Sequence, residues 1–116
     1  MKKEIIKGSE NLTKKEIYVL TMAQTAKMTE AAGQIVDIDR WAEFKDVDMK
    51  TGEERDVLSI MTADGEVFST ISKVFIEHFN DIVDLFGDDP DGLPAVKVIQ
   101  GKSKNGRQYL DVTVAM

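Results

Sequence analysis

The clearest pattern of apolar and polar positions lies between Ser72 and Gly87. Apolar residues recur there at spacings of one, three and four, the 3.6-residue period of an amphipathic helix; they are Phe75, Ile76, Phe79, Ile82, Val83 and Phe86. Ser72 is a favourable N-cap residue, and Gly87 is a favourable helix terminator. The sequence therefore predicts one helix between these two residues, with its three phenylalanines packed in a core.

On both sides of this helix, apolar and polar residues alternate as they do in half-buried β-strands. One strand pair, in 57–71, surrounds Asp64-Gly65, and another, in 96–114, surrounds Asn-Gly106; both dipeptides favour tight hairpin turns. A further strand is expected at 34–46. Three strands, a helix and two strands is the element order of a five-stranded OB-fold barrel, a mainly β fold whose members commonly bind nucleic acid on one face.

The beginning of the chain has a different character. Residues 1–12 are mostly polar and charged, so we expect a flexible N-terminal arm. Thr13 and Glu16 then match a capping box, which predicts a helix at 14–25 whose apolar stripe packs on the rest of the protein. The chain of 116 residues is long enough for one compact core but short for two. We therefore expect a single domain at 13–116 that contains this N-terminal helix and the barrel.

The Asp64-Gly65 turn predicts which side chains of its hairpin face outward. A two-residue loop places Met61 opposite Phe68 and puts Ile60 and Ile71 on the other face. The face with Ile60 is the more aliphatic and is expected to point inward, which leaves Phe68 and Met61 on the outer face. An exposed phenylalanine beside a methionine is unfavourable unless something covers it. The cover is either the N-terminal helix or a ligand.

The last hairpin has an inner face of five aliphatic residues: Val96, Val98, Leu110, Val112 and Val114. Lys97 and Tyr109 alternate with them and are expected to face outward near the basic loop 102–107. In the first barrel strand, Trp41 and Phe44 fall on opposite faces, and a bulge before Trp41 would exchange those faces. The pattern leaves the orientation of both aromatic residues open.

Charge is distributed unevenly along the chain. The net charge of −6 at first argues against nucleic acid, because phosphates are bound by lysine and arginine. Acidic residues are concentrated in 81–91, whereas the last strand pair has only Asp111 against four cations: Lys97, Lys102, Lys104 and Arg107. These cations form either a phosphate-binding surface or an ordinary solvated hairpin tip.

Few residues suggest catalytic or metal chemistry. The chain has no cysteine, and its acidic stretch 88–92 lacks the ligand spacing of a calcium loop. We find no phosphate-cradling glycine loop and no nucleophile motif, and the only histidine, His78, falls off the apolar stripe of its helix. We therefore predict that the protein is not an enzyme and needs no cofactor or metal. No apolar run approaches the roughly 18 residues of a membrane span, so we expect no membrane partner and a cytoplasmic location.

Several short segments give a more specific indication. They are Thr62-Ala-Asp-Gly-Glu-Val-Phe-Ser-Thr-Ile-Ser-Lys73, followed by a helix, Val96-Lys-Val-Ile-Gln-Gly101 and Ser103-Lys-Asn-Gly106, with a weaker likeness at Ala42-Glu-Phe-Lys45. In their order and spacing, these segments resemble the small single-stranded DNA-binding proteins of protein-primed phages of Gram-positive bacteria, the Bacillus-type podoviruses. The resemblance covers about two thirds of the chain.

This resemblance implies a protein that coats the strands displaced during replication, protects them from nucleases and prevents unproductive polymerase binding. It implies single-stranded DNA as the partner, with the phage replication machinery and further copies of the protein along the DNA as additional partners. Aromatic residues of the first and third barrel strands are implicated in DNA contact in this family, and the matching positions are Phe44 and Phe68.

We therefore predict a sequence-independent DNA-binding site on the outer face of the first three barrel strands. The residues expected beneath bases are Phe44, Phe68, Trp41 and Tyr109. The residues expected at phosphates are Arg40, Lys45, Lys73, Lys97, Lys102, Lys104 and Arg107. The alternative is a protein-interaction module without nucleic-acid binding, in which Phe68 and Met61 form the interface.

Overall fold

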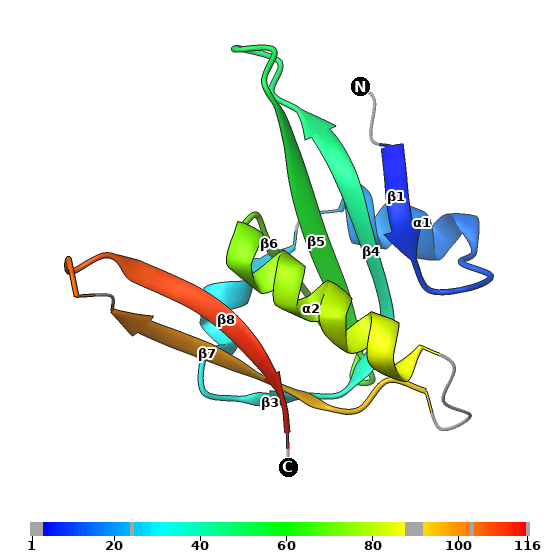
Figure 1. Ribbon diagram of the computed structural model, residues 1–116. Helices are drawn as coiled ribbons and strands as arrows, with labels where there is room; N and C mark the ends of the chain where they lie inside the picture. The colour runs from blue at the N-terminus through cyan, green and yellow to red at the C-terminus, as the bar shows by residue number, and fades with distance from the viewer. Residues whose placement is uncertain (1–3, 24, 88–91, 103, 116) are drawn as a thin grey trace.

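The computed structural model describes residues 4–23, 25–87, 92–102 and 104–115. Within them the chain is mainly β with two α-helices and a 3-10 helix, η1 (Figure 1). The elements are β1 (Glu4–Gly8), α1 (Lys14–Thr21), β2 (Ala26–Lys27), η1 (Met28–Ala31), β3 (Ile35–Val36), β4 (Ile38–Val47), β5 (Glu54–Thr62), β6 (Val67–Thr70), α2 (Lys73–Phe86), β7 (Val96–Lys102) and β8 (Gln108–Val114). The predicted order of three strands, a helix and two strands is present from β4 to β8.

The strands do not close into the predicted five-stranded barrel. Two separate sheets are present in the described part of the chain, one with the strand order β1-β4-β5-β6-β2 and one with the order β3-β7-β8. Closure of an OB barrel would need a strand of the last hairpin to pair with the second edge of the first barrel strand, which here is β4. That edge of β4 is instead occupied by β1, and both β7 and β8 lie in the smaller sheet with β3.

Strand β1 lies in the segment that was predicted to be a flexible arm. Residues 4–8 pair antiparallel with β4, with Ile5 opposite Phe44, and the pairing has a bulge between Ile5 and Lys7. Ile5 is half-buried at this position. These residues are therefore part of the larger sheet, because pairing satisfies the backbone groups on one edge of β4. Since β1 comes first, α1 does not begin the fold as the prediction had it.

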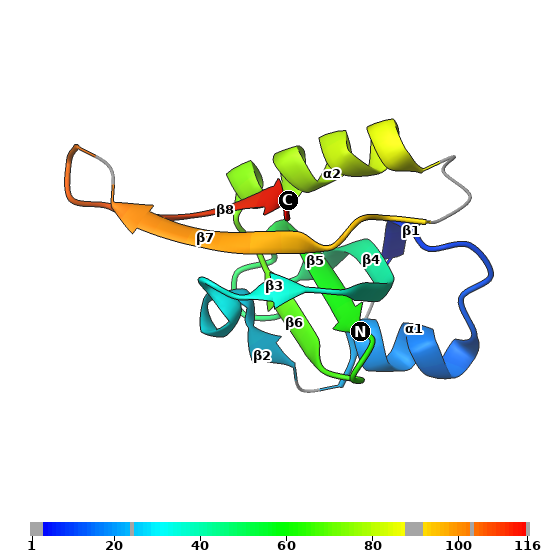
Figure 2. The ribbon, with the colours of Figure 1, turned by 90° about the horizontal axis from the view of Figure 1, so that it is seen from below.

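The core lies between the two sheets and α2 (Figures 1 and 2). Helix α2 contributes Phe75, Ile76 and Phe79, whereas the third phenylalanine predicted to be in the core, Phe86, is half-buried and lies outside the core cluster. The other buried members come from η1 and from strands of both sheets: Met28, Ala31, Val36, Trp41, Leu58, Ile60, Phe68, Val96, Val98, Leu110 and Val112. Trp41 meets Phe79 edge to face, with 5.2 Å between the ring centroids, a favourable geometry for two aromatic rings.

Helix α1 covers the other face of the larger sheet, opposite α2 (Figure 2). The predicted capping box is present: the Glu16 N–H donates to Thr13 Oγ1 at 3.1 Å, and the Thr13 N–H donates to Glu16 Oε1 at 2.9 Å. The backbone hydrogen bond from Thr13 is the main cause of a lowered pKa at Glu16, and Arg40 adds to it. The helix ends at Thr21 rather than near residue 25.

We expect a Thr13→Ala variant to lower the free energy of unfolding by about 1 kcal/mol, the usual effect of removing an N-cap side chain. The reason is that the Glu16 N–H would lose its acceptor at the start of α1. Urea denaturation followed by circular dichroism measures the change. Lys15→Ala, an exposed substitution in the same turn, is the control and should change the midpoint much less. Equal effects of the two variants would contradict a stabilising cap.

The loop between β5 and β6 differs from the predicted two-residue turn. The Thr62 N–H donates to the Glu66 carbonyl at 2.8 Å, so the connection consists of the three residues 63–65. Gly65 has a φ of +86°, in the left-handed region that glycine adopts without steric penalty. A three-residue hairpin loop with glycine in that region is a common alternative to the two-residue turn.

The longer loop shifts the hairpin register by one residue. Phe68 lies opposite Ile60, and Val67 rather than Phe68 lies opposite Met61. A shift of one residue moves a side chain to the other face of a strand. Phe68 therefore points into the core, where it is only 7% exposed, and the prediction that it faces outward was wrong.

A contact between α2 and β8 involves the only histidine. His78 Nδ1 lies 2.6 Å from Asp111 Oδ1, although the two residues are far apart in sequence. The hydrogen bond and the charge of Asp111 favour the imidazolium and raise the pKa of His78 above its ordinary value. The exposed side chain was expected from the sequence, but its partner was not.

This contact predicts a pH dependence of stability. Because the pKa of His78 is raised on folding, its contribution is fully present below the ordinary histidine pKa of about 6.5 and is lost as the pH rises through the raised value. We expect urea midpoints measured from pH 6 to pH 9 to show a difference between wild type and His78→Gln at the acidic end that disappears at the alkaline end. A difference that stays constant over this range would contradict the ion pair.

Candidate functional site

Three of the four aromatic residues predicted to contact DNA are buried. Phe68 and Trp41 belong to the core, and Trp41 is 6% exposed. Phe44 is 3% exposed and shares its face of β4 with Arg40, which contacts α1. Neither face of these rings is open to a base, so the predicted aromatic surface on the first three barrel strands is not present.

Tyr109 is exposed, as predicted. Its side chain is 45% accessible, and it lies opposite Gly101 in the pairing of β7 with β8. A Cβ atom at residue 101 would come within 2.5 Å of the Tyr109 hydroxyl oxygen and 2.6 Å of Cζ. The phenol ring therefore rests directly on the glycine backbone, which explains why this strand position holds glycine. The contact supports an exposed aromatic ring on the hairpin.

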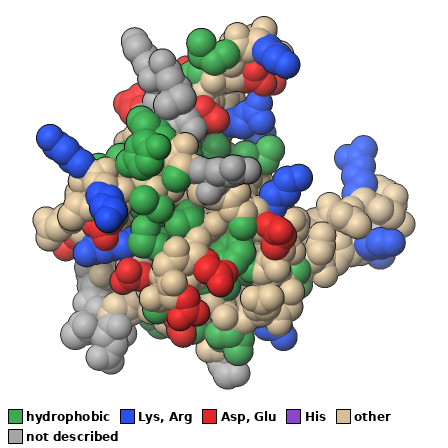
Figure 3. All heavy atoms as spheres, turned by 180° about the vertical axis from the view of Figure 1, so that it is seen from behind, with side chains coloured by type: hydrophobic (Ala, Val, Ile, Leu, Met, Phe, Trp, Pro, Cys, Tyr) green, Lys and Arg blue, Asp and Glu red, His purple; other side chains and the backbone are tan. Residues whose placement is uncertain are grey.

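Two hairpins project from the protein in different directions (Figure 1). We call them the β4–β5 arm, with its connecting loop 48–53, and the β7–β8 arm, with loop residues 104–107. The β7–β8 arm carries the predicted cations Lys97, Lys102, Lys104 and Arg107, all of them exposed. Figure 3 shows lysine and arginine side chains at the tip of this projection. The single acidic residue among them, Asp111, is engaged with His78, so the arm is strongly basic.

The β4–β5 arm carries charges of both signs and is acidic overall, with three cations and five carboxylates in residues 45–56. Lys45 Nζ lies 3.8 Å from Glu54 Oε2, and an Arg55 nitrogen lies 2.9 Å from Asp48 Oδ2. Asp48 also accepts from the backbone N–H of Lys50 at 2.8 Å, and this hydrogen bond is the main cause of its lowered pKa. The Asp48 carboxylate therefore binds both the loop backbone and the Arg55 guanidinium at the tip of the arm.

A groove runs between the two arms. It consists of three adjoining hollows of about 290, 400 and 410 Å³, and all three are lined by Ile71. Ile71 and Val74 are exposed apolar residues in it, at 57% and 47%. We call it the interarm groove; its lining also includes Lys27, Met28, Thr29, Lys45, Glu54, Arg55, Asp56, Val57, Ser69, Thr70, Ser72, Lys73, Gln100, Gln108, Tyr109 and Leu110.

The groove brings together part of the predicted phosphate-binding set. Lys45 and Lys73 line it, and Lys73 is the first residue of α2. Arg40 does not, because its guanidinium reaches Glu16 at 3.0 Å on the α1 side. Lys97 lines a different hollow on the outer face of the smaller sheet. Lys102, Lys104 and Arg107 lie beyond the groove, at the end of the β7–β8 arm.

Sequence reasoning missed two groove cations and the apolar floor. Lys27 lies in the two-residue strand β2, which no pattern marked. Arg55 precedes the apolar part of β5 and was not considered. Ile71 was expected to face inward, but the register shift leaves it exposed. The signal in the sequence was that Ile71 directly follows the last residue of the alternating strand pattern. It could have indicated an exposed apolar residue in the groove.

Other kinds of site find no support in the described residues. None of their His, Asp and Glu side chains form a group of three that could hold a metal ion. Over the same residues, no helix has the length and apolar character needed to cross a membrane. Most of the acidic stretch that was compared with a calcium loop, residues 88–91, lies outside the described ranges.

Comparisons with known proteins identify the family of this chain. Residues 3–115 match the family model described as phage single-stranded DNA-binding protein. The chain is 31% identical over 86 residues to the single-stranded DNA-binding protein of Bacillus phage phi29, a match that covers 72% of this chain and 69% of the relative. The corresponding protein of Bacillus phage PZA matches with the same identity and coverage. No solved structure matches. The chain therefore belongs to the phage single-stranded DNA-binding protein family, a family of binding proteins rather than enzymes.

Proposed function

We infer that this protein binds single-stranded DNA without sequence preference and coats strands displaced during phage replication in the cytoplasm of the bacterial host. The observation that carries the inference is the interarm groove, which places exposed apolar side chains between two hairpins that carry cations. Bases have apolar faces and phosphates are anionic, so this combination suits a single strand of any sequence.

The place of the groove in the topology supports this inference. In OB-folds, oligonucleotides bind across the second and third strands and between the loops that join strands one to two and four to five. Here those loops belong to the β4–β5 and β7–β8 arms. We propose that β4 to β8 form an open version of the OB arrangement, in which β1 takes the edge that barrel closure would use.

The charge distribution suggests how the protein covers a strand. With a net charge of −6, one copy is expected to bind modestly and with a strong dependence on salt, because only the cations of the arms and the groove are placed to contact phosphates. Many copies along a strand would compensate for the modest affinity of each. Self-association on DNA and contact with the replication machinery are parts of this proposal.

Fluorescence anisotropy of labelled oligo-dT, titrated with protein at 50 mM to 500 mM salt, tests the function. We expect saturable binding that weakens steeply with salt, and weaker binding to a duplex of the same length. Absence of binding at low salt would overturn the proposal. Self-association that does not respond to salt, without oligonucleotide binding, would favour the protein-interaction module instead.

In this proposal Tyr109 stacks on a base, and the buried Phe44, Phe68 and Trp41 do not. We expect Tyr109→Ala to weaken oligo-dT binding by roughly tenfold, within the range for loss of one aromatic–base contact. Tyr18→Ala is the matched control, because Tyr18 is similarly exposed but lies on α1. If both variants bind as wild type does, stacking on Tyr109 is excluded.

A further inference from the structure

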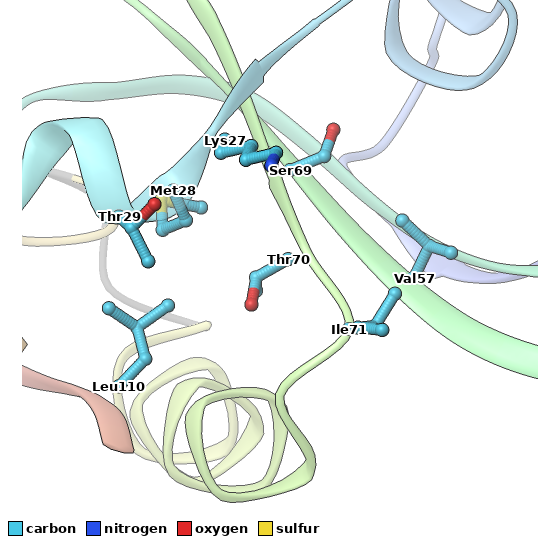
Figure 4. A pocket seen from close by; sticks show the side chains of 8 residues that line it. All are labelled: Lys27, Met28, Thr29, Val57, Ser69, Thr70, Ile71 and Leu110. Atoms are coloured by element: carbon cyan, nitrogen blue, oxygen red, sulfur yellow. The ribbon is translucent and has the colours of Figure 1, made fainter. Parts of the chain in front are cut away.

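We propose that one nucleobase of the bound strand inserts into the 290 Å³ hollow of the interarm groove and that Lys27 holds the adjoining phosphate. This inference rests on the proposed function and makes it more specific, since it replaces contact along an open surface with a defined subsite. We call this hollow the base pocket; the side chains that line it are labelled in Figure 4.

The walls of the base pocket are apolar. Met28, Val57 and Leu110 are largely buried side chains that line it, and Ile71 forms an exposed edge. They come from η1, β5, β8 and the residue after β6, and Figure 4 shows them arranged around one open space. Apolar groups on several sides suit the two faces of a flat ring, which are themselves poorly hydrated.

The volume of the pocket is appropriate for a base. At about 290 Å³, the hollow is large enough to admit the flat ring of a nucleobase. The pocket is open toward the rest of the groove, with which it shares Thr29, Thr70, Ile71 and Leu110. A strand lying in the groove can therefore turn one base inward without leaving it.

The polar groups of the pocket favour no particular base. Thr70 Oγ1 accepts from the Ser72 N–H at 3.1 Å, and its hydroxyl hydrogen stays available for donation. Thr29 is an exposed residue in the lining of the pocket. A threonine hydroxyl both donates and accepts, so these two groups can pair with the edge of any base. Ser69 is already engaged, 2.6 Å from the Ser59 hydroxyl and 2.8 Å from that of Thr25.

Lys27 differs from the groove cations on the β4–β5 arm. Lys45 and Arg55 each lie beside a carboxylate, so part of their charge is already neutralised. Lys27 is exposed and forms no ion pair within the described ranges, although its backbone N–H donates to Glu30 Oε2 at 3.0 Å. Its ammonium group is thus available at the mouth of the pocket. A phosphate beside an inserted base would meet this charge.

The first test is to fill the pocket without adding an aromatic face. Thr29→Leu places a branched apolar side chain at the pocket and removes one hydroxyl. We expect it to weaken oligo-dT binding about tenfold and to leave unchanged the binding of an abasic oligonucleotide with the same number of phosphates. Thr113→Leu, on the exposed outer face of β8, is the matched control and should bind both oligonucleotides as wild type does.

A second test uses the wild-type protein and so does not depend on the folding of a variant. Oligo-dT that contains a single 2-aminopurine is bound in excess protein and titrated with acrylamide. We expect a fraction of the 2-aminopurine fluorescence to become shielded from the quencher, and Lys27→Gln to reduce that fraction whereas Lys15→Gln does not. Free deoxynucleoside monophosphates should not compete at micromolar concentrations, because only the strand supplies the remaining contacts.

The outcomes separate this inference from the proposed function. If wild-type protein binds neither oligo-dT nor the abasic oligonucleotide at low salt, the proposed function fails. If it binds both oligonucleotides equally, or if oligo-dT binding is unchanged in Thr29→Leu and 2-aminopurine stays fully quenchable, the base pocket is overturned while DNA binding stands. Loss of oligo-dT affinity in Thr29→Leu together with shielding in wild type would support it.

Discussion

Replacing Phe68 with alanine is expected to lower the free energy of unfolding by about 3 to 5 kcal/mol, the range for a phenylalanine removed from a core. Phe68 is 7% exposed and packs in the cluster that also contains Ile60 and Phe75. The deleted ring would leave a cavity between the sheet and α2 that the surrounding side chains cannot fill completely. Urea denaturation followed by circular dichroism gives the change.

The same variant should leave DNA affinity nearly unchanged once the folded fraction is taken into account. An outward Phe68 that stacks on bases, as the turn pattern indicated, would instead lower DNA affinity when it is replaced by alanine. Tyr109→Ala provides the opposite control, with weakened binding and little change in stability, because its ring is exposed. Phe68→Leu keeps most of the apolar volume and should recover most of the stability. A Phe68→Ala protein that is as stable as wild type but binds oligo-dT poorly would contradict this assignment.

The error at Phe68 has a simple physical origin. Asp64-Gly65 is compatible with a two-residue turn and also with a three-residue loop that uses glycine in the left-handed region. The two loops differ by one residue of register, and one residue exchanges the faces of a strand. The choice depends on how the whole hairpin packs, since only the three-residue loop places Phe68 against the core cluster. Local sequence does not contain that information.

Helix α2 could be predicted because all of its signals are local. Its apolar residues repeat on one period, and Ser72 and Gly87 mark its ends, as the structure has them. Strand β4 could not be oriented because both of its faces are covered. Trp41 and Glu43 point toward α2, where the Asn80 side-chain amide donates to Glu43 Oε1 at 3.0 Å, while Phe44 faces the α1 side. A strand buried on both faces shows no alternation to read.

The candidate site was partly predictable for the same reason. Tyr109 and the cations of the β7–β8 arm lie on a regular hairpin with one exposed face, so alternation placed them outward. The groove floor is made by contacts between segments that are distant in the chain, such as Lys27 of β2 beside Ser69 of β6. Strand β1 could not be predicted for a similar reason. Its segment is polar apart from two isoleucines, and it forms a strand only because it pairs with the edge of β4.

The tip of the β7–β8 arm carries the second large prediction. We expect the triple variant Lys102→Ala, Lys104→Ala and Arg107→Ala to bind oligo-dT about 100-fold more weakly than wild type at 50 mM salt. Each phosphate contact to a single strand contributes about 0.7 to the slope of log affinity against log salt, so three lost contacts reduce that slope by about 2. Because 0.5 M is a tenfold rise in salt, the same relation predicts that the hundredfold difference has nearly disappeared at 0.5 M salt.

A control with the same net charge separates local contact from general electrostatics. Lys7→Ala, Lys14→Ala and Lys15→Ala also remove three exposed cations, from β1 and the start of α1. Both triple variants have a net charge of −9, because three positive charges are removed from a chain of −6. If the cations act through contact with the DNA strand, only the arm variant should show a smaller slope of log affinity against log salt. Its three residues extend from the end of the interarm groove, whereas the control residues do not. Equal losses in both variants would mean that net charge governs the affinity and that the arm has no special part in binding.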